Sequence, residues 1–307
     1  MIVQNGDRDL VGYGRHPPDP KWPHGARVAL NFVLNIEEGS EYAIEHGDGF
    51  SEGMLTEMGE SPLPRGARDL AAEGMFEYGS RAGVWRIFDL FAERNLPMTG
   101  FACALALERL PELAAAWRAA GHDICCHGWR WVNHWQLSEA EEHEHIARAV
   151  ASLKSTVGEA PPGWYCRYGP SVNTRRLVVE HGGFVYDSDA YNDELPYYVA
   201  VAGKPHLVVP YTLATNDVKF MGGGGIGNGD DFERLLRDAL DLLRAESPRR
   251  GGKMMSVGMH ARVLGHPPRA AGLARFLDYV GSLPDVWICR RIDIAKHWLA
   301  THPAPAA

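Results

Sequence analysis

The chain has 307 residues, a formal net charge of −8 at pH 7, and a composition that is 45% hydrophobic and 23% charged. This composition is ordinary for a folded domain and excludes a disordered chain. The negative charge disfavours nucleic acid as a partner because a polyanion is repelled. No apolar stretch approaches the roughly 20 residues of a membrane span. With no secretion signal and five cysteines in no metal-binding or disulfide pattern, we expect a cytoplasmic protein with no membrane partner.

The first 25 residues are rich in Pro, Gly and His. This composition predicts an extended N-terminal arm, residues 1–25, that lies on the domain or on a neighbouring subunit. A strand is predicted next at 28–36, because this mostly apolar run is typical of a strand that is buried on both faces. Asn31 and Asn35 are its only polar residues.

From residue 107 onward, predicted helices and strands alternate. Helices are expected at 107–120, 138–157, 173–181, 231–246, 268–280 and 292–299, and strands at 123–127, 164–168, 184–188, 207–213, 254–259 and 286–289. The helix at 138–157 has the clearest ends, because Ser138 and Glu141 have capping-box spacing and Gly158 follows. Alternating strands and helices predict an α/β fold with a parallel sheet. At this length we expect a closed (β/α) barrel, a single domain over residues 1–307.

The candidate site residues follow predicted strands, at the edge where barrel enzymes carry their functional groups. They are Glu37 and Glu38, His127 to Trp131, Arg167 to Pro170, Asp187 to Asp189, and His260 to Arg262. Carboxylates, histidines and arginines at one rim are the groups that acid–base hydrolysis needs. Each taken singly has a structural explanation, such as a solvated loop for the two glutamates. Their joint occurrence in barrel order favours the functional interpretation.

Two other groups of histidines have the side chains that could bind a metal. His143 and His145 flank Glu144 inside a predicted amphipathic helix, so a solvated helix face is the preferred interpretation. His134 lies beyond a strand end, and its role stays open.

The rim residues resemble the motifs of the polysaccharide deacetylase (NodB-like) superfamily, whose fold is a deformed (β/α) barrel. That family's Asp-Asp pair corresponds to Glu37-Glu38, and one Asp and two His of the family hold a metal. The corresponding ligand set here is Glu38, His127 and Trp131. An indole N–H only donates and cannot bind a cation. The resemblance therefore implies a site with no metal and no other cofactor.

The Glu-His-Trp replacement is similar to that of the metal-independent allantoinases of this superfamily, and the likeness extends over nearly the whole chain. Strings that carry it include residues 9–14, 77–86, 173–176, 193–197, 210–213 and 291–295. Cys166 and Tyr168 depart from the pattern of that branch. A tyrosine at the rim suits a flatter, less polar ring than allantoin, so cyclic-imide hydrolases are the competing assignment. The allantoinase-like relatives imply a homotetramer.

The resemblance thus implies a hydrolase that opens a ring C–N bond of a small cyclic amide or imide without a metal. Glu37 is the expected general base, and His260 is expected to stabilise the oxyanion or protonate the leaving nitrogen. Glu38 and His127 are expected to pair, with Trp131 filling the space of the metal. The expected substrate contacts are Glu77, Arg167, Tyr168, Pro170 and Asn173.

Two other functions stay open. The first is a metal-dependent deacetylase of an acetylated sugar, in which His134 replaces the missing ligand. The second is a catalytically inactive barrel that binds cyclic amides without turning them over.

Overall fold

A computed structural model describes residues 3–221 and 226–304. Within these residues, ten strands form one sheet in the order β1-β7-β8-β6-β5-β4-β3-β2-β10, and β9 pairs with the other edge of β2. The strands are β1 (Val3–Gln4), β2 (Val28–Ile36), β3 (Thr99–Ala102), β4 (Asp123–Cys126), β5 (Gly163–Trp164), β6 (Tyr186–Asp187), β7 (Tyr197–Val201), β8 (Lys204–Val208), β9 (Lys253–His260) and β10 (Val286–Ile288). Neighbours are parallel except β7 and β8, which are antiparallel.

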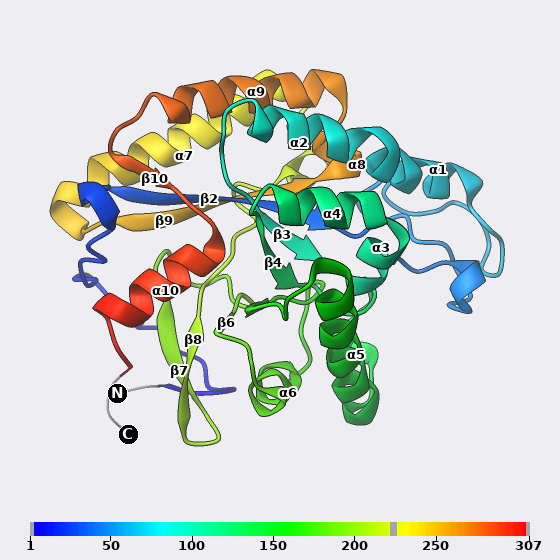
Figure 1. Cartoon of the computed structure of the whole chain (residues 1–307), viewed down its shortest axis with the longest axis horizontal. Helices are drawn as coiled ribbons and strands as arrows, with labels where there is room; N and C mark the ends of the chain where they lie inside the picture. Colours follow the sequence, from blue (N-terminus) through cyan, green and yellow to red (C-terminus); the bar gives the residue numbers. More distant parts are fainter. Residues whose placement is uncertain (1–2, 222–225, 305–307) are drawn as a thin grey trace.

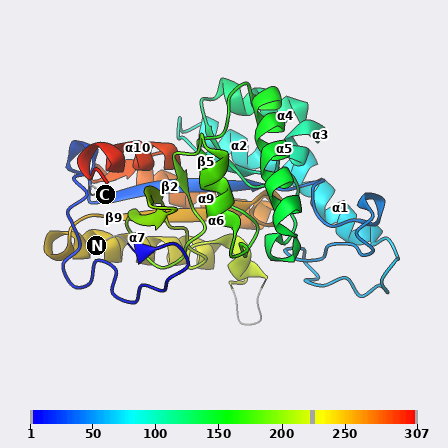
Figure 2. The same cartoon turned by 90° about the horizontal axis from the view of Figure 1, so that it is seen from below.

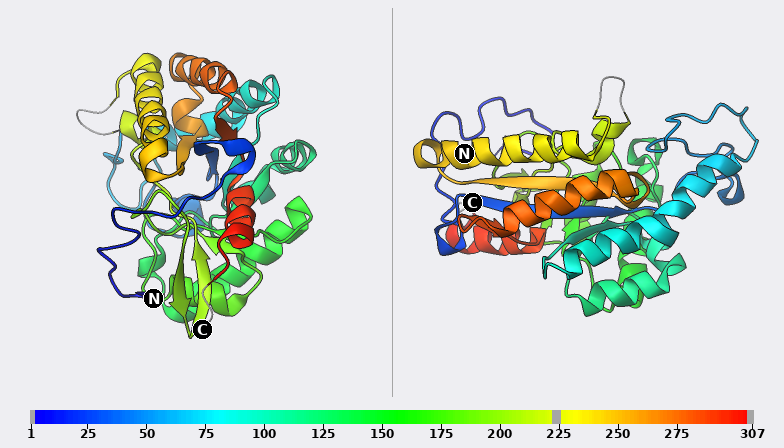
Figure 3. Two further views of the ribbon diagram at one scale, coloured as in Figure 1. Left: turned by 90° about the vertical axis from the view of Figure 1, so that its left-hand side faces the viewer. Right: turned by 90° about the horizontal axis from the view of Figure 1, so that it is seen from above.

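The sheet curls into the deformed barrel that the sequence predicted, but it is not closed. In the part of the chain that the structure describes, one bridge between Asn216 and Gly258 joins the segment after β8 to β9. We call this junction the seam. The α/β fold class is therefore confirmed, and the expectation of a fully closed barrel is wrong. The long β2–β9 pair forms the centre of the molecule, and α7 (Gly229–Arg250) and α9 (Pro267–Gly281) lie over it (Figures 1 and 3).

Helices surround this sheet on its outer side (Figure 1). They are α1 (Leu70–Tyr78), α2 (Val84–Ala92), α3 (Ala104–Arg109), α4 (Pro111–Ala119), α5 (Glu139–Val157), α6 (Thr174–His181), α7 (Gly229–Arg250), α8 (Ala261–Leu264), α9 (Pro267–Gly281) and α10 (Arg291–Thr301). A π-helical turn, Gly79–Gly83, joins α1 to α2. Among the helices of the described residues, none has the length and apolar character to cross a membrane.

All nine residues of β2 are buried, as its apolar sequence predicted. Its two asparagines donate across the sheet, Asn31 to the carbonyl oxygen of Met255 and Asn35 to that of Met259. The barrel interior also contains Arg291, whose guanidinium is fully buried. Its guanidinium donates to oxygens of Asn31, Ser256, Ser188, Val209 and Pro210, which come from several strands and from the ends of others.

The N-terminal arm lies against the domain over its described part. β1 pairs with β7, and the Tyr13 hydroxyl donates to the carbonyl oxygen of Pro196. Trp22 is buried, and its indole N–H donates to the carbonyl oxygen of Lys253. Residues 1–2 of the predicted arm, and residues 305–307 of the predicted domain, lie outside the described residues. Each of the five cysteines, all in described segments, is buried and free.

Candidate active site

A cavity of about 940 Å³ opens at the carboxyl ends of the strands. Its polar floor comes from Asn35, Glu37, His127, Tyr165, Asn216 and His260. Part of its wall comes from the loop at residues 50–67, which extends beyond the end of β2 near α1 (Figure 2). A second cavity, of about 1020 Å³, lies beside the N-terminal arm, and of the predicted site residues its described lining contains Asp189 alone.

A tight turn after β2 places Glu37 at this cavity. Ser40 closes the turn, since its amide and its hydroxyl both donate to the carbonyl oxygen of Glu37. Gly39 has a φ of +84°, a backbone conformation that favours glycine. The turn therefore projects Glu37 from the end of a strand that is fixed on both edges.

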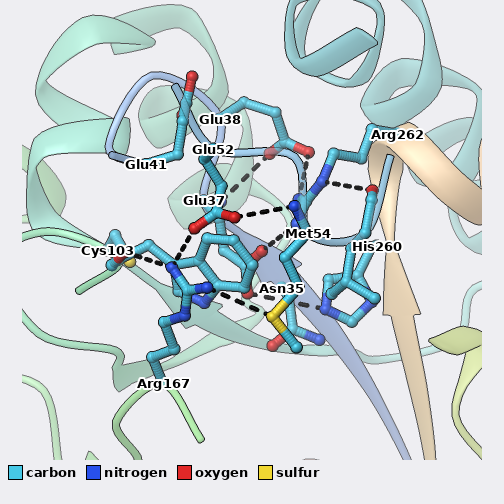
Figure 4. Close-up of polar contacts among 12 residues, drawn as sticks. Asn35, Glu37, Glu38, Glu41, Glu52, Met54, Cys103, Arg167, His260 and Arg262 are labelled. Atoms are coloured by element: carbon cyan, nitrogen blue, oxygen red, sulfur yellow. Dashed lines mark hydrogen bonds and ion pairs between the residues drawn. The ribbon is translucent and has the colours of Figure 1, made fainter. Parts of the chain in front are cut away.

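The Glu37 carboxylate is fully buried and has cationic partners (Figure 4). Oε2 accepts from Nη2 of Arg262 at 2.7 Å, while Oε1 lies 3.2 Å from Nε2 of His127 and 3.7 Å from Nε2 of His260. Burial by itself raises the pKa of Glu37, but the charges of Arg262 and His260 and the contact with His127 outweigh it. The pKa therefore lies well below its usual range, and Glu37 is ionised at neutral pH.

His127 follows β4 and is held by the strand beside it. Nδ1 donates to the carbonyl oxygen of Tyr165 at 2.8 Å, and the Tyr165 ring stacks on the imidazole with a centroid distance of 5.1 Å. These contacts direct Nε2 at Glu37. The expected pair of His127 with Glu38 is therefore wrong, because His127 contacts the first glutamate and not the second.

His260 ends β9 and forms a second acid–base unit with Asp217. Nδ1 lies 2.6 Å from Oδ1 of Asp217, and the backbone N–H of His260 donates to the other carboxylate oxygen. Burial by itself lowers the pKa of His260. The negative charges of Asp217 and Glu37 raise it by more than burial lowers it, so the net shift of the pKa is upward. The second ring nitrogen, Nε2, remains directed at Glu37 and the cavity.

Glu38 contacts Arg262 rather than the cavity. Its Oε1 accepts from Nη1 of Arg262 at 3.3 Å, and its Oε2 accepts from the backbone N–H of Glu37 at 3.1 Å. Burial raises the pKa of Glu38, and the neighbouring charge of Glu37 adds to this, against the opposing effect of Arg262. Arg262 therefore bridges two adjacent carboxylates whose pKa shifts have opposite signs.

Trp131 is buried between two guanidinium groups. The Arg167 guanidinium carbon lies 3.8 Å from the Trp131 ring centroid, and that of Arg262 lies 5.1 Å away. Arg167 also donates to Glu52 at 2.5 Å and to the carbonyl oxygen of Trp131 at 3.1 Å. The backbone N–H of Trp131 donates to the carbonyl oxygen of Ser40. This hydrogen bond links the loop after β4 to the turn after β2.

The predicted substrate contacts separate into two groups. Arg167 and Tyr168 line the cavity. Glu77 does not, because its side chain is 63% exposed and pairs with Arg81. Pro170 and Asn173 also lie outside the cavity lining, in the segment leading into α6. These three residues are therefore not among those that line the described cavity.

Within residues 77–86, it is Gly79 that affects the site, because it has no side chain. A Cβ atom on Gly79 would lie 2.5 Å from Oε1 of Glu38 and 2.9 Å from its Cδ. The π-helical turn that begins at Gly79 therefore leaves room for the Glu38 carboxylate. Turns of this kind are frequent at functional sites.

The residues present do not fit the family's metal. Of the three positions that would hold it, Trp131 supplies only an N–H donor, and Glu38 accepts from Arg262. Within residues 3–221 and 226–304, no three His, Cys, Asp or Glu side chains converge in a way that could hold a metal ion. His134 does not complete the set, because it is buried with Nδ1 3.0 Å from Glu142.

The solvated helix face expected around His143 is only partly correct. His143 and Glu144 are exposed. His145 instead faces inward, where its Nε2 accepts from the backbone N–H of Trp129 at 2.7 Å. Burial and the neighbouring charges of His134 and Arg130 lower the pKa of His145 to about 3, so it is a neutral acceptor. Its role is to fix the loop that carries Trp131.

Sequence reasoning missed Asp217, Glu52 and the role of Arg262. Asp217 stands four residues after the predicted strand at 207–213, so a search for carboxylates near strand ends could have found it. Arg262 was noted only as part of the rim after His260. No local signal marks Glu52, which lies in a loop that is 115 residues from its partner Arg167.

The site thus brings an ionised carboxylate together with a histidine–aspartate pair at the open end of a deformed (β/α) barrel, and such groups are those that acid–base hydrolysis uses. A family model described as polysaccharide deacetylase matches residues 71–186. A putative polysaccharide deacetylase of Schizosaccharomyces pombe is 39% identical, over 97% of this chain and 99% of its own. The chain therefore belongs to the polysaccharide deacetylase family.

Two solved structures are similar over 97% of this chain and 99% of their own. One is a probable polysaccharide deacetylase from Pseudomonas aeruginosa PAO1, at 50% identity and a TM-score of 0.93. The other is a protein named PuuE allantoinase, at 51% identity and a TM-score of 0.93. Both are thus similar at the level of the whole chain.

Proposed function

We propose that this protein opens the ring C–N bond of a small cyclic amide, ureide or imide, with Glu37 as the general base. The observation that carries the proposal is the buried, ionised Glu37 carboxylate, with the His260 imidazole 3.7 Å away at the same cavity. The similarity to PuuE allantoinase supports the substrate class.

In the proposed reaction, Glu37 takes a proton from water as the water oxygen bonds to the ring carbonyl carbon. The C–N bond then breaks, and its electron pair goes to the nitrogen. That nitrogen takes a proton from Nε2 of His260, whose other nitrogen is held by Asp217. The product carries a carboxyl group and a free N–H. Glu37 and His260 return to their starting states by exchanging protons with solvent.

Arg167 is placed to orient the substrate. Its guanidinium is buried at the cavity wall, and Nε has no hydrogen-bond partner in the described chain. We propose that the part of the Arg167 guanidinium that faces the cavity donates to a ring carbonyl of the substrate. The Trp131 ring stacked beneath the guanidinium limits how far it can turn.

The ring that fits best is a flat one, and we propose a cyclic imide as an alternative substrate to allantoin. Tyr168 lines the cavity and is 62% exposed, so its ring is available to a substrate. The cavity lining also includes apolar side chains, among them Phe50, Leu63, Leu213 and Met221. An apolar wall favours a ring with few polar substituents over the ureido side chain of allantoin.

A ring-opening assay on chelator-treated protein tests the proposal, with allantoin, dihydrouracil, hydantoin, succinimide and phthalimide compared side by side. We expect turnover of at least one ring without added metal, and the preferred ring decides between allantoinase and imidase. Absence of turnover across the whole panel, with and without added metal, would refute the proposed reaction.

Replacing Glu37 by Gln removes the base and keeps the shape of the side chain. We expect kcat to fall by roughly 10²- to 10⁴-fold, the range for loss of a general base. The matched control is Glu77→Gln, which changes an exposed glutamate outside the cavity and should leave kcat unchanged. Near-full turnover by the Glu37→Gln variant would show that another group is the base.

A metal-dependent deacetylase is the second candidate, and the names of the similar proteins from S. pombe and P. aeruginosa favour it. Activity that appears only with zinc and an acetylated sugar would support this function.

The third candidate is an inactive barrel, which would bind cyclic amides without turnover. We also propose that the protein is a cytoplasmic homotetramer, and light scattering on the eluting protein tests the assembly.

A further inference from the structure

Glu37 and Glu38 are adjacent in the chain, and both are buried. The exposed fraction is 1% for Glu37 and 4% for Glu38. Burial of one carboxylate is costly, and burial of two adjacent carboxylates is costlier because their charges repel. A cation that contacts both carboxylates offsets this cost. Arg262 supplies it, with Nη2 2.7 Å from Glu37 and Nη1 3.3 Å from Glu38.

The Arg262 guanidinium is held on its other sides as well. Its Nε donates to the carbonyl oxygen of Leu55 at 3.0 Å, and its carbon lies 4.3 Å from the Phe76 ring centroid. The Trp131 ring is 5.1 Å away, on a loop that also carries His127. The guanidinium is thus surrounded by two carboxylates, a carbonyl and two aromatic rings, and it is 3% exposed.

We propose that Arg262 is the resident cation of this site, which compensates the charge of the carboxylate pair and excludes a divalent metal from Glu38 and His127. A metal beside Glu38 would face the fixed positive charge of Arg262 and would compete for the same carboxylate oxygens. In this inference Trp131 is not the only barrier to a metal, since a better ligand at position 131 would still meet the guanidinium. The description of Glu37 as the base rests on the proposed function, but the exclusion of a metal rests on the contacts alone.

The test introduces a histidine at position 131, with and without removal of the cation. Zinc binding is measured by calorimetry and by metal content after gel filtration for Trp131→His and for Trp131→His/Arg262→Met. We expect the double variant to bind one zinc ion per chain, at least about 100-fold more tightly than Trp131→His alone, because three ligands suffice only when the guanidinium is gone. We also expect zinc to raise the melting temperature of the double variant, because binding stabilises the folded state.

Trp131→His/Arg167→Met is the matched control. Arg167 stacks on the same indole but pairs with Glu52, so its removal should not create zinc affinity. If Trp131→His binds zinc as tightly as the double variant, or if the folded double variant does not bind zinc, the proposal is wrong. Near-ultraviolet circular dichroism establishes that each variant is folded.

Removing Arg262 leaves two buried carboxylates without their cation, which could prevent folding. Trp131→His/Arg262→Gln then provides the same test, because glutamine keeps a donor for the carbonyl oxygen of Leu55 but carries no charge. No assay in this set depends on ring opening. A failure of the proposed function therefore leaves the zinc measurement decisive.

Discussion

Glu37 and Glu38 differ by one position in the chain and are similarly buried, yet their pKa values shift in opposite directions. The difference comes from their neighbours. Glu37 lies near Arg262, His127 and His260, whereas Glu38 has Arg262 alone and is repelled by Glu37. Two carboxylates with different environments can hold different roles in one site. Glu37 is ionised and therefore has a free lone pair at the cavity, and Glu38 is suited to position Arg262.

Asp217 gives the site a pH dependence that can be measured. His260 must be protonated to deliver a proton, and its pKa is raised above 6.5 by Asp217 and Glu37 against the effect of burial. Activity should therefore fall as the pH rises through this elevated pKa. Asp217→Asn removes one of the two charges that raise it, so the alkaline limb of kcat/KM should move to lower pH. An alkaline limb that does not move would exclude His260 as the acid.

At the scale of single elements, the sequence predicted most helices and strands beyond residue 107, but it missed those between residues 37 and 106, the amphipathic helix α2 included. The helix expected at 138–157 is α5, with the Ser138 capping box and a left-handed Gly158. The helix expected at 107–120 is divided, because α3 ends before Pro111, which lacks an N–H and begins α4. β3 has only four residues and α1 has a weak apolar pattern, so neither was predicted.

The candidate site was predictable only where it follows strands. Glu37, His127 and His260 could be placed in this way, because the ends of parallel strands meet at one edge. Their partners could not. Arg262 reaches Glu37 across 225 positions of the chain, and spacing along the sequence does not encode such a contact.

The π-helical turn allows a sharp comparison of two glycines. Gly79→Ala should displace Glu38, because the new methyl group would lie within 3 Å of its carboxylate. We expect a loss of roughly 1–3 kcal/mol in the free energy of unfolding, typical of an overpacked core, together with reduced kcat. Gly74→Ala is the control, since Gly74 lies in α1 with no atom within 4 Å of its missing Cβ. That change should increase stability by up to about 1 kcal/mol. Urea unfolding of both variants tests this, and equal effects would contradict it.

At the scale of the whole molecule, Arg291 links strands that are far apart in the sequence. Its guanidinium hydrogen-bonds to five residues inside the barrel, with oxygens from carbonyls, hydroxyls and an amide as acceptors. These oxygens would be left without a donor if the side chain were apolar. The barrel interior is therefore held by a polar network as well as by apolar packing.

Arg291→Met should lower the free energy of unfolding by about 3–5 kcal/mol, because several buried acceptors lose a charged donor at once. Its neighbour Arg290 is the control. Arg290 is partly exposed and pairs with Asp293 at the surface, so Arg290→Met should cost no more than about 1 kcal/mol. Chemical denaturation of both variants gives the comparison. Similar losses would mean that the buried network contributes little to stability.

The seam has a consequence for the timing of motions in this molecule. β9 is held by β2 along one edge for eight residue pairs, whereas along the other edge its amides donate to loop segments rather than to a strand, as from Gly258 to Thr215 and from His260 to Asp217. Segments with few backbone hydrogen bonds open locally at low free-energy cost. Opening there would carry Asp217 away from His260 while Glu37 stays on the closed side. The acid half of the site would then fluctuate on a faster timescale than the base half, and hydrogen exchange should show the amide of Gly258 less protected than those in the middle of β2.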